Sequence, residues 1–204
     1  MKALRTNSPG RPQLLLPQIT LILLVLCPLS VHAGVLWTES FESYTPGAFP
    51  GPPWVNSGNA DVKIDNQIRA AGESSLRLFG VLRSCWGALA HRALTTSPPY
   101  EIEFSVRNGH EALSGCHPWH GIAQLNTGPS WTTPVRELIR FDGKGEIRSY
   151  GSNGGQGISL GTYLPNIWYR AKVRYQIVDT QTVRLTYWIN GEFRGREDLP
   201  ATSH

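Results

Sequence analysis

The sequence lacks a second long apolar run after the one at residues 19–30, ITLILLVLCPLS, so we expect no membrane span beyond it. Lys2, Arg5 and Arg11 precede this run, and VHA at Val31–Ala33 supplies the small residues that a signal peptidase recognises. A basic start, a short apolar run and a small-residue cleavage site are typical of a secretory signal. We therefore predict a signal peptide at 1–33 and an exported mature chain at 34–204, in the extracellular space or the periplasm.

The mature chain also lacks a surplus of basic charge. Removal of residues 1–33 takes away three basic residues and no acid, which lowers the formal charge from +4 to +1. Proteins that bind nucleic acid concentrate many lysine and arginine side chains on one surface. The composition therefore excludes nucleic acid as a leading partner.

Cysteine is scarce. Of the three cysteines, Cys27 lies in the signal, which leaves Cys85 and Cys116. In an oxidising compartment such a pair favours a disulfide, which would stabilise the fold by about 3–4 kcal/mol. Cys116 belongs to GCHPWHG at 115–121, where His117 and His120 suggest a zinc site, but a disulfide removes Cys116 as a ligand. We interpret the stretch as a loop held by the bridge, with Trp119 as a candidate ligand contact.

No stretch carries the apolar spacing of an amphipathic helix. Alternation with a period of two recurs instead, as in YEIEFSVR (100–107), WYRAKVRYQIV (168–178) and TVRLTYWING (182–191). In the second of these, Tyr169 to Ile177 place every other residue inward, and Arg170, Lys172 and Arg174 point outward. Shorter strands are predicted at 74–79, 87–94 and 120–126, and GSNGGQG (151–157) is interpreted as a hairpin loop.

Turn residues separate these strands. Asn190-Gly191 and Asp142-Gly143 both favour two-residue hairpin turns, because these residue types accept positive φ. Strands with one apolar and one polar face predict an all-β, two-sheet antiparallel sandwich.

Several segments in one order carry a resemblance: SFESYTPGAFP, AAGESSLRLFG and GTYLPNIWYRAKVRYQI followed by TVRLTYWINGEF. Together they resemble the LamG-like jelly-roll domains of the concanavalin A-like lectin/glucanase superfamily. The resemblance covers most of residues 37 to 195 and implies one jelly-roll domain over 34–204. These domains usually end with a further strand beside the first one, whereas this chain ends at REDLPATSH. Either that last strand is missing, or a partner completes the sheet edge.

Glu101 and Glu103 form the strongest carboxylate pair, about 6.6 Å apart along one strand face. The glucanases that the resemblance brings in carry E-x-D-x-x-E or E-x-D-x-E on one strand, and here Ser105 or Val106 stands where the second glutamate belongs. A glycoside hydrolase or lyase that uses Glu101 and Glu103 is therefore one alternative. The other reading is a pair of solvated carboxylates that contact neighbouring arginines.

A row of cationic and aromatic side chains suits sugar rings, acidic sugars or sulfated glycans. It consists of Arg170, Lys172, Arg174, Arg184 and Trp188. An ordinary solvated face is the alternative. The candidates for a calcium site are Asp61, Asp65, Asn66 and Asp142, although their spacing matches no calcium signature. Calcium is the only cofactor that the residues suggest.

Three functions remain open. The first is a secreted carbohydrate-binding module without catalytic activity, the second is the hydrolase or lyase on the same fold, and the third is a structural or adhesive module that binds a protein through its open sheet edge.

Overall fold

The computed structural model describes residues 35, 37–56, 61–79, 90–92, 98–108, 121–126, 137–149 and 157–201. The chain divides into two units, Met1–Thr38 and Glu39–His204. Nearly all of the first unit lies outside the described residues, and every described strand belongs to the second unit. The described residues contain no helix that is long and apolar enough to cross a membrane.

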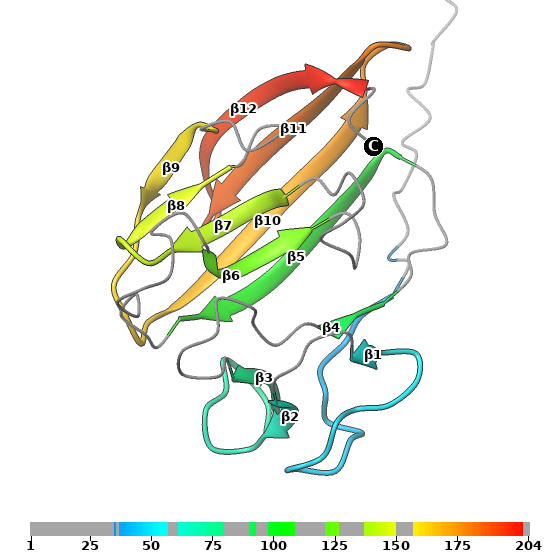
Figure 1. Cartoon of the computed structure of the whole chain (residues 1–204), viewed down its shortest axis with the longest axis vertical. Helices are drawn as coiled ribbons and strands as arrows, with labels where there is room; N and C mark the ends of the chain where they lie inside the picture. Colours follow the sequence, from blue (N-terminus) through cyan, green and yellow to red (C-terminus); the bar gives the residue numbers. More distant parts are fainter. Residues whose placement is uncertain are drawn as a thin grey trace, which may run out of the picture. The chain divides into compact units, whose positions relative to one another are not determined.

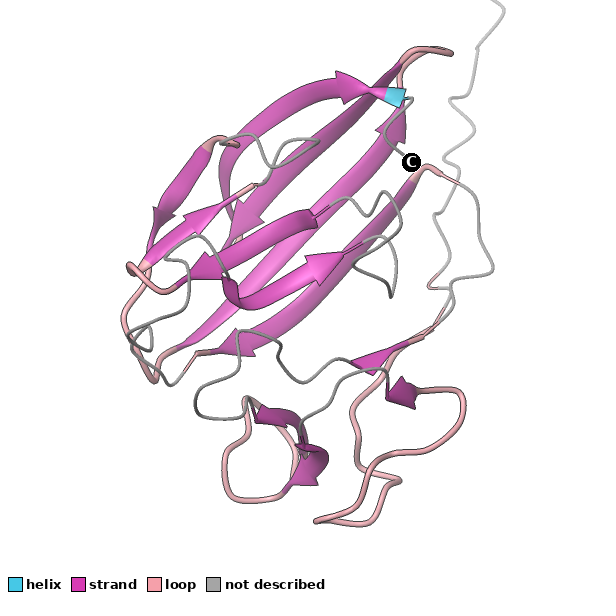
Figure 2. Ribbon diagram, in the orientation of Figure 1, coloured by secondary structure: helices cyan, strands magenta, loops and turns pink. Residues whose placement is uncertain are grey.

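The second unit is built from antiparallel strands, and Figure 2 shows strands and loops with one short helical turn after the last strand. Two sheets have four strands each. The first has the order β12-β11-β10-β5, made of β5 (Tyr100–Arg107), β10 (Trp168–Ile177), β11 (Thr182–Ile189) and β12 (Glu192–Pro200). The second has the order β6-β7-β8-β9, made of β6 (Gly121–Asn126), β7 (Glu137–Asp142), β8 (Glu146–Arg148) and β9 (Ser159–Thr162).

Two small sheets complete the described strands. One pairs β1 (Val55–Asn56) with β4 (Ala90–His91), and the other pairs β2 (Asp61–Asp65) with β3 (Ser75–Phe79). The predicted strands at 74–79 and 120–126 are confirmed to within one residue. Of the predicted strand at 87–94, the described part is β4 alone.

The hydrophobic core lies between the two four-stranded sheets (Figure 1). Alternate residues of β10 and β11 supply one side of it, and β7, β8 and β9 supply the other. Ile139 and Leu185 are fully buried, and the rings of Phe141 and Tyr169 lie 6.0 Å apart across the two sheets. Side chains from two facing sheets that interdigitate in this way define a sandwich, so the predicted all-β two-sheet architecture is confirmed.

The period of two predicted the correct faces but not where burial ends. In β10 the alternate residues from Ala171 to Tyr175 are buried, whereas Ile177 is 58% exposed. Alternation determines the side of a strand on which a residue lies, and burial also requires that a second layer cover that position. The prediction that Ile177 points into the core was therefore wrong.

The two predicted hairpin turns differ. Asn190 and Gly191 have φ values of 53° and 82°, as a two-residue turn with positive φ at both positions requires. Between β7 and β8 the loop has three residues, Gly143 to Gly145, and the positive φ of 81° belongs to Gly145. The amide of Gly145 donates to the carbonyl of Asp142, and the Asp142 carboxylate accepts from two further amides of the loop. The predicted two-residue turn at Asp142-Gly143 was wrong, because this carboxylate stabilises a wider loop.

β12 ends the described strands and forms one edge of its sheet. Its pairing with β11 shifts register, so that Trp188 pairs with Phe193 and Tyr187 with Gly195. The extra residue is Arg194, which makes this a β-bulge. Gly195 has a φ of 156°, and a Cβ added there would lie 2.8 Å from Cδ1 of Ile158. A residue with a Cβ at position 195 would therefore require the Ile158 side chain to shift.

Two of the motif segments are joined by one carboxylate. Oε1 of Glu42, in SFESY, accepts hydrogen bonds from the amides of Glu73 and Ser74 at 2.9 and 3.1 Å. A Cβ on Gly72 would lie 2.2 Å from the same oxygen, and Gly72 has a φ of 66°. The glutamate of the first motif and the glycine of the second therefore depend on each other.

Candidate ligand-binding face

The predicted cationic row lies on the surface of the first sheet that points away from the core. We call this surface the outer face. It is defined by the outward side chains of β5, β10, β11 and β12, which are Glu101, Glu103, Ser105, Arg107, Trp168, Arg170, Lys172, Arg174, Gln176, Thr182, Arg184, Thr186, Trp188, Phe193, Arg196, Asp198 and Pro200. The strand register brings Lys172 between Glu103 on β5 and Trp188 on β11. All five predicted contacts on β10 and β11 thus share one face.

Ion pairs connect β5 to β10 across this face. Glu101 contacts both Arg174 and Lys172, with Nζ of Lys172 at 3.6 Å from the carboxylate, and Glu103 contacts Arg170. The side chains are well exposed, at 69% for Arg170 and 39% for Glu101. The interpretation of Glu101 and Glu103 as carboxylates that contact arginine therefore describes their geometry correctly.

A second ion pair connects β11 to β12. Nε and Nη2 of Arg184 each donate to one carboxylate oxygen of Asp198 at 2.7 Å. These hydrogen bonds lower the pKa of Asp198 from its ordinary value and raise that of Arg184. The two-point geometry fixes the guanidinium plane on the sheet.

Two aromatic side chains of the outer face, Trp188 and Phe193, contact each other. Nζ of Lys172 lies 4.4 Å from the centre of the Trp188 ring, and Cζ of Arg174 lies 5.3 Å from it, so two cations cover the ring. Phe193 contacts Trp188 edge to face, with ring centres 6.4 Å apart, and is 61% exposed. Phe193 is therefore the more accessible ring of the two.

Phe193 did not appear among the predicted contacts, although the sequence contains the signal for it. A two-residue turn at Asn190-Gly191 pairs the residues on either side of it in order, which places residue 193 opposite residue 188. Trp188 is one of the predicted contacts, and counting two residues beyond the turn identifies Phe193 as its cross-strand partner.

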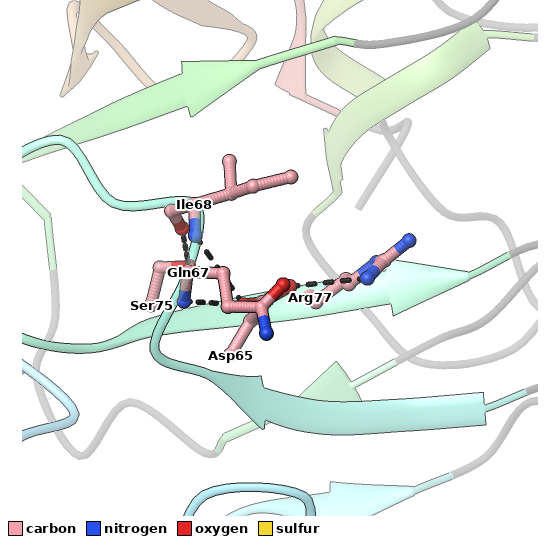
Figure 3. A network of polar contacts seen from close by, with 5 residues as sticks. All are labelled: Asp65, Gln67, Ile68, Ser75 and Arg77. Carbon is pink, nitrogen blue, oxygen red and sulfur yellow. Dashed lines mark hydrogen bonds and ion pairs between the residues drawn. The ribbon is translucent and has the colours of Figure 1, made fainter.

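The calcium candidates lie in two separate hairpins, and the carboxylates of Asp65 and Asp142 form hydrogen bonds within the chain. Oδ1 of Asp65 accepts from the amides of Gln67 and Ile68 at 2.7 and 3.3 Å, and Oδ2 contacts Arg77 at 3.1 Å (Figure 3). The hydrogen bond from Gln67 is the main cause that lowers the pKa of Asp65. Asn66 follows in the same turn, and Asp61 begins β2. The Asp142 carboxylate accepts from the amides of Lys144 and Glu146.

Within the described part of the chain, no cluster of three or more His, Cys, Asp and Glu side chains could hold a metal ion. Oδ1 of Asp65 and Oδ1 of Asp142 already accept hydrogen bonds from backbone amides. Calcium binding stays a prediction.

Several predicted features lie outside the described residues. These are the signal peptide at 1–33, the cysteines Cys85 and Cys116, and the loop that contains His117, Trp119 and His120. The disulfide and the part of Trp119 in ligand binding stay predictions.

Comparison of the chain with protein-family models, with curated proteins and with solved structures found no match.

Proposed function

We propose that the protein is a secreted carbohydrate-binding module and that the outer face is its binding site. The observation that carries this proposal is the exposed ring of Phe193 next to Trp188, surrounded by arginine, lysine and glutamate side chains. Sugar rings present an apolar face and a rim of hydroxyl groups, and sites that bind them combine a flat aromatic surface with side chains that form hydrogen bonds. The outer face offers both within one sheet.

The exposure of each side chain on the outer face indicates its part in binding. Phe193 supplies the stacking surface, because Lys172 and Arg174 already cover the Trp188 ring. Trp188 packs edge to face against Phe193. Arg170, whose side chain is 69% exposed at one side of the ion-pair row, reaches the hydroxyl groups of a bound sugar. The hydrogen-bonding groups are held by strands and by each other, so little conformational entropy is lost on binding.

The family and the compartment belong to the same proposal. The confirmed sandwich and the Glu42–Gly72 contact between two motif segments support membership of the LamG-like jelly-roll domains. We propose export through a signal peptide at 1–33 and a disulfide between Cys85 and Cys116, as the scarcity of cysteine and the apolar N-terminal run favour.

A glycan array tests the binding function, run with the purified protein in the presence and absence of EDTA. We expect binding that survives EDTA, is lost in Phe193→Ala and is retained in Leu164→Ala. Leu164 is a matched control because its side chain is 68% exposed in the loop after β9 and lies outside the outer face. Silence across neutral and acidic glycans would sink the proposal, and loss of binding with EDTA would assign a part to calcium.

We favour binding over hydrolysis because Glu101 and Glu103 lie on an exposed face in ion pairs. Glycosidases hold one carboxyl group protonated in a sheltered position beside the second carboxylate. Polysaccharide turnover by the protein that disappears in both Glu101→Gln and Glu103→Gln would reverse this preference.

A further inference from the structure

We propose that the ligand of the outer face is an acidic polysaccharide and that Glu101 and Glu103 occupy its cationic subsites until it binds. The proposal rests on the carbohydrate-binding function proposed above and specifies the charge of the ligand. In this proposal the two carboxylates compete with the ligand for the arginine and lysine side chains. Neither ring stacking nor hydrolysis requires such competition.

The first argument is the charge of the outer face. Its side chains include the six cations Arg107, Arg170, Lys172, Arg174, Arg184 and Arg196 against the three carboxylates Glu101, Glu103 and Asp198, a net charge of +3. The whole mature chain has a formal net charge of +1. The positive surplus of the mature chain is therefore concentrated on this one surface, and the field there favours an anion.

The second argument is the weakness of the ion pairs. Arg170 is 69% exposed and its partner Glu103 is 37% exposed, and the pair of Arg174 with Glu101 is exposed to a similar degree. Ion pairs between exposed side chains contribute little, because water screens them and two long side chains lose freedom. An incoming carboxylate or sulfate group can therefore replace Glu101 or Glu103 at small cost.

The third argument is geometric. Arg170, Lys172 and Arg174 lie on one face of β10 at every second position, about 6.6 Å apart along the strand. The guanidinium group binds carboxylate and sulfate-like anions through two parallel hydrogen bonds. The register places this row beside Trp188 and its partner Phe193. One extended sugar chain can therefore stack on the Phe193 ring and contact the cations at the same time.

The test measures affinity for three probes: a polyuronate, which carries carboxylates, heparin, which carries sulfates, and dextran, which is neutral. The proteins compared are the wild type, Glu101→Gln with Glu103→Gln, Arg170→Gln with Arg174→Gln, and Glu146→Gln. Glu146 is the matched control, since it pairs with Arg148 in the other sheet. Thermal unfolding of each variant establishes that it is folded.

The competitor assignment makes a prediction of opposite sign for the two double variants. Removal of the glutamates tightens binding of an acidic probe about two- to fivefold per carboxylate, because the cations no longer have a competing partner. Removal of the arginines weakens it, and the affinity of the wild type falls as salt is added. Glu146→Gln leaves every affinity unchanged. The preferred acidic probe identifies the anionic group as carboxylate or sulfate.

Three results overturn the inference. Unchanged or weaker binding of the acidic probes after removal of the glutamates contradicts the competitor assignment. Binding of dextran that requires Phe193, without binding of either acidic probe, contradicts the acidic ligand and leaves the carbohydrate-binding function in place. Failure to bind any of the three probes, together with a silent glycan array, overturns both proposals.

Discussion

Substitution of Gly195 by alanine tests the contact between the edge strand β12 and Ile158, which precedes β9 in the second sheet. A methyl group at this position would lie 2.8 Å from Cδ1 of Ile158 and 3.8 Å from Cδ2 of Leu160, at a φ of 156° that L residues rarely adopt. Overpacking of a well-packed contact costs about 1–3 kcal/mol, and an unfavourable backbone conformation costs about as much again. We therefore expect Gly195→Ala to lower the free energy of unfolding by about 2–4 kcal/mol.

The clash and the backbone strain can be separated with Ile158→Val, which removes the methyl group nearest to the added Cβ. Alone, this substitution costs about 0.5–1.5 kcal/mol. Combined with Gly195→Ala, it relieves the clash and leaves the strain, so the double variant should be about 1 kcal/mol more stable than the sum of the single effects predicts. Urea unfolding followed by tryptophan fluorescence measures all four proteins. Additive effects would refute the close approach of β12 to Ile158.

The same assay checks three further expectations. Asp65→Asn should lower the free energy of unfolding by about 1–2 kcal/mol near neutral pH, because it removes the charge from the hydrogen bonds to the amides of Gln67 and Ile68 and from the ion pair with Arg77. Because the pKa of Asp65 is lowered, its stabilisation is present above about pH 4 and is lost as the pH falls, so the stabilities of wild type and variant should converge as the pH falls below about 4. Gly72→Ala should cost more than Gly47→Ala: both glycines have positive φ, but the Cβ at 72 meets Glu42 while the Cβ at 47 has open space, and equal costs would refute the contact. Burial raises the pKa of Tyr163 to about 12, so the fold should lose stability between about pH 10 and pH 12, and Tyr163→Phe should lose less over that interval.

Local patterns predicted the strands well because the determinants of a strand lie within it. Alternation in residues 100–107, 168–177 and 182–189 predicted three neighbouring strands of one sheet and the direction of their side chains. Alternation carries no information on how far the opposite sheet extends, which is why Ile177 was placed in the core. The three-residue loop before Gly145 depends on hydrogen bonds of the Asp142 side chain, and the Asp-Gly pair alone does not specify them.

The candidate site was predictable as a set of residues but not as a set of contacts. The sequence placed Arg170, Lys172 and Arg174 outward, yet the choice of Glu101 or Glu103 as partner depends on the register between β5 and β10, which are about 60 residues apart. For Phe193 the reverse holds, because the hairpin turn at Asn190-Gly191 determines its cross-strand partner. Counting residues outward from this turn is sufficient to find that partner, Trp188.

The charged sequence of β12 also bears on the solubility of the protein. A nine-residue strand at a sheet edge presents backbone groups to which another chain can add a strand. A second chain that pairs along β12 must accommodate the bulge at Arg194 and the charges of Glu192, Arg196 and Asp198. Bulges and charged side chains are the features by which edge strands resist such pairing. The bulge at Arg194, together with these charges, therefore lowers the tendency of the sheet to grow into an aggregate.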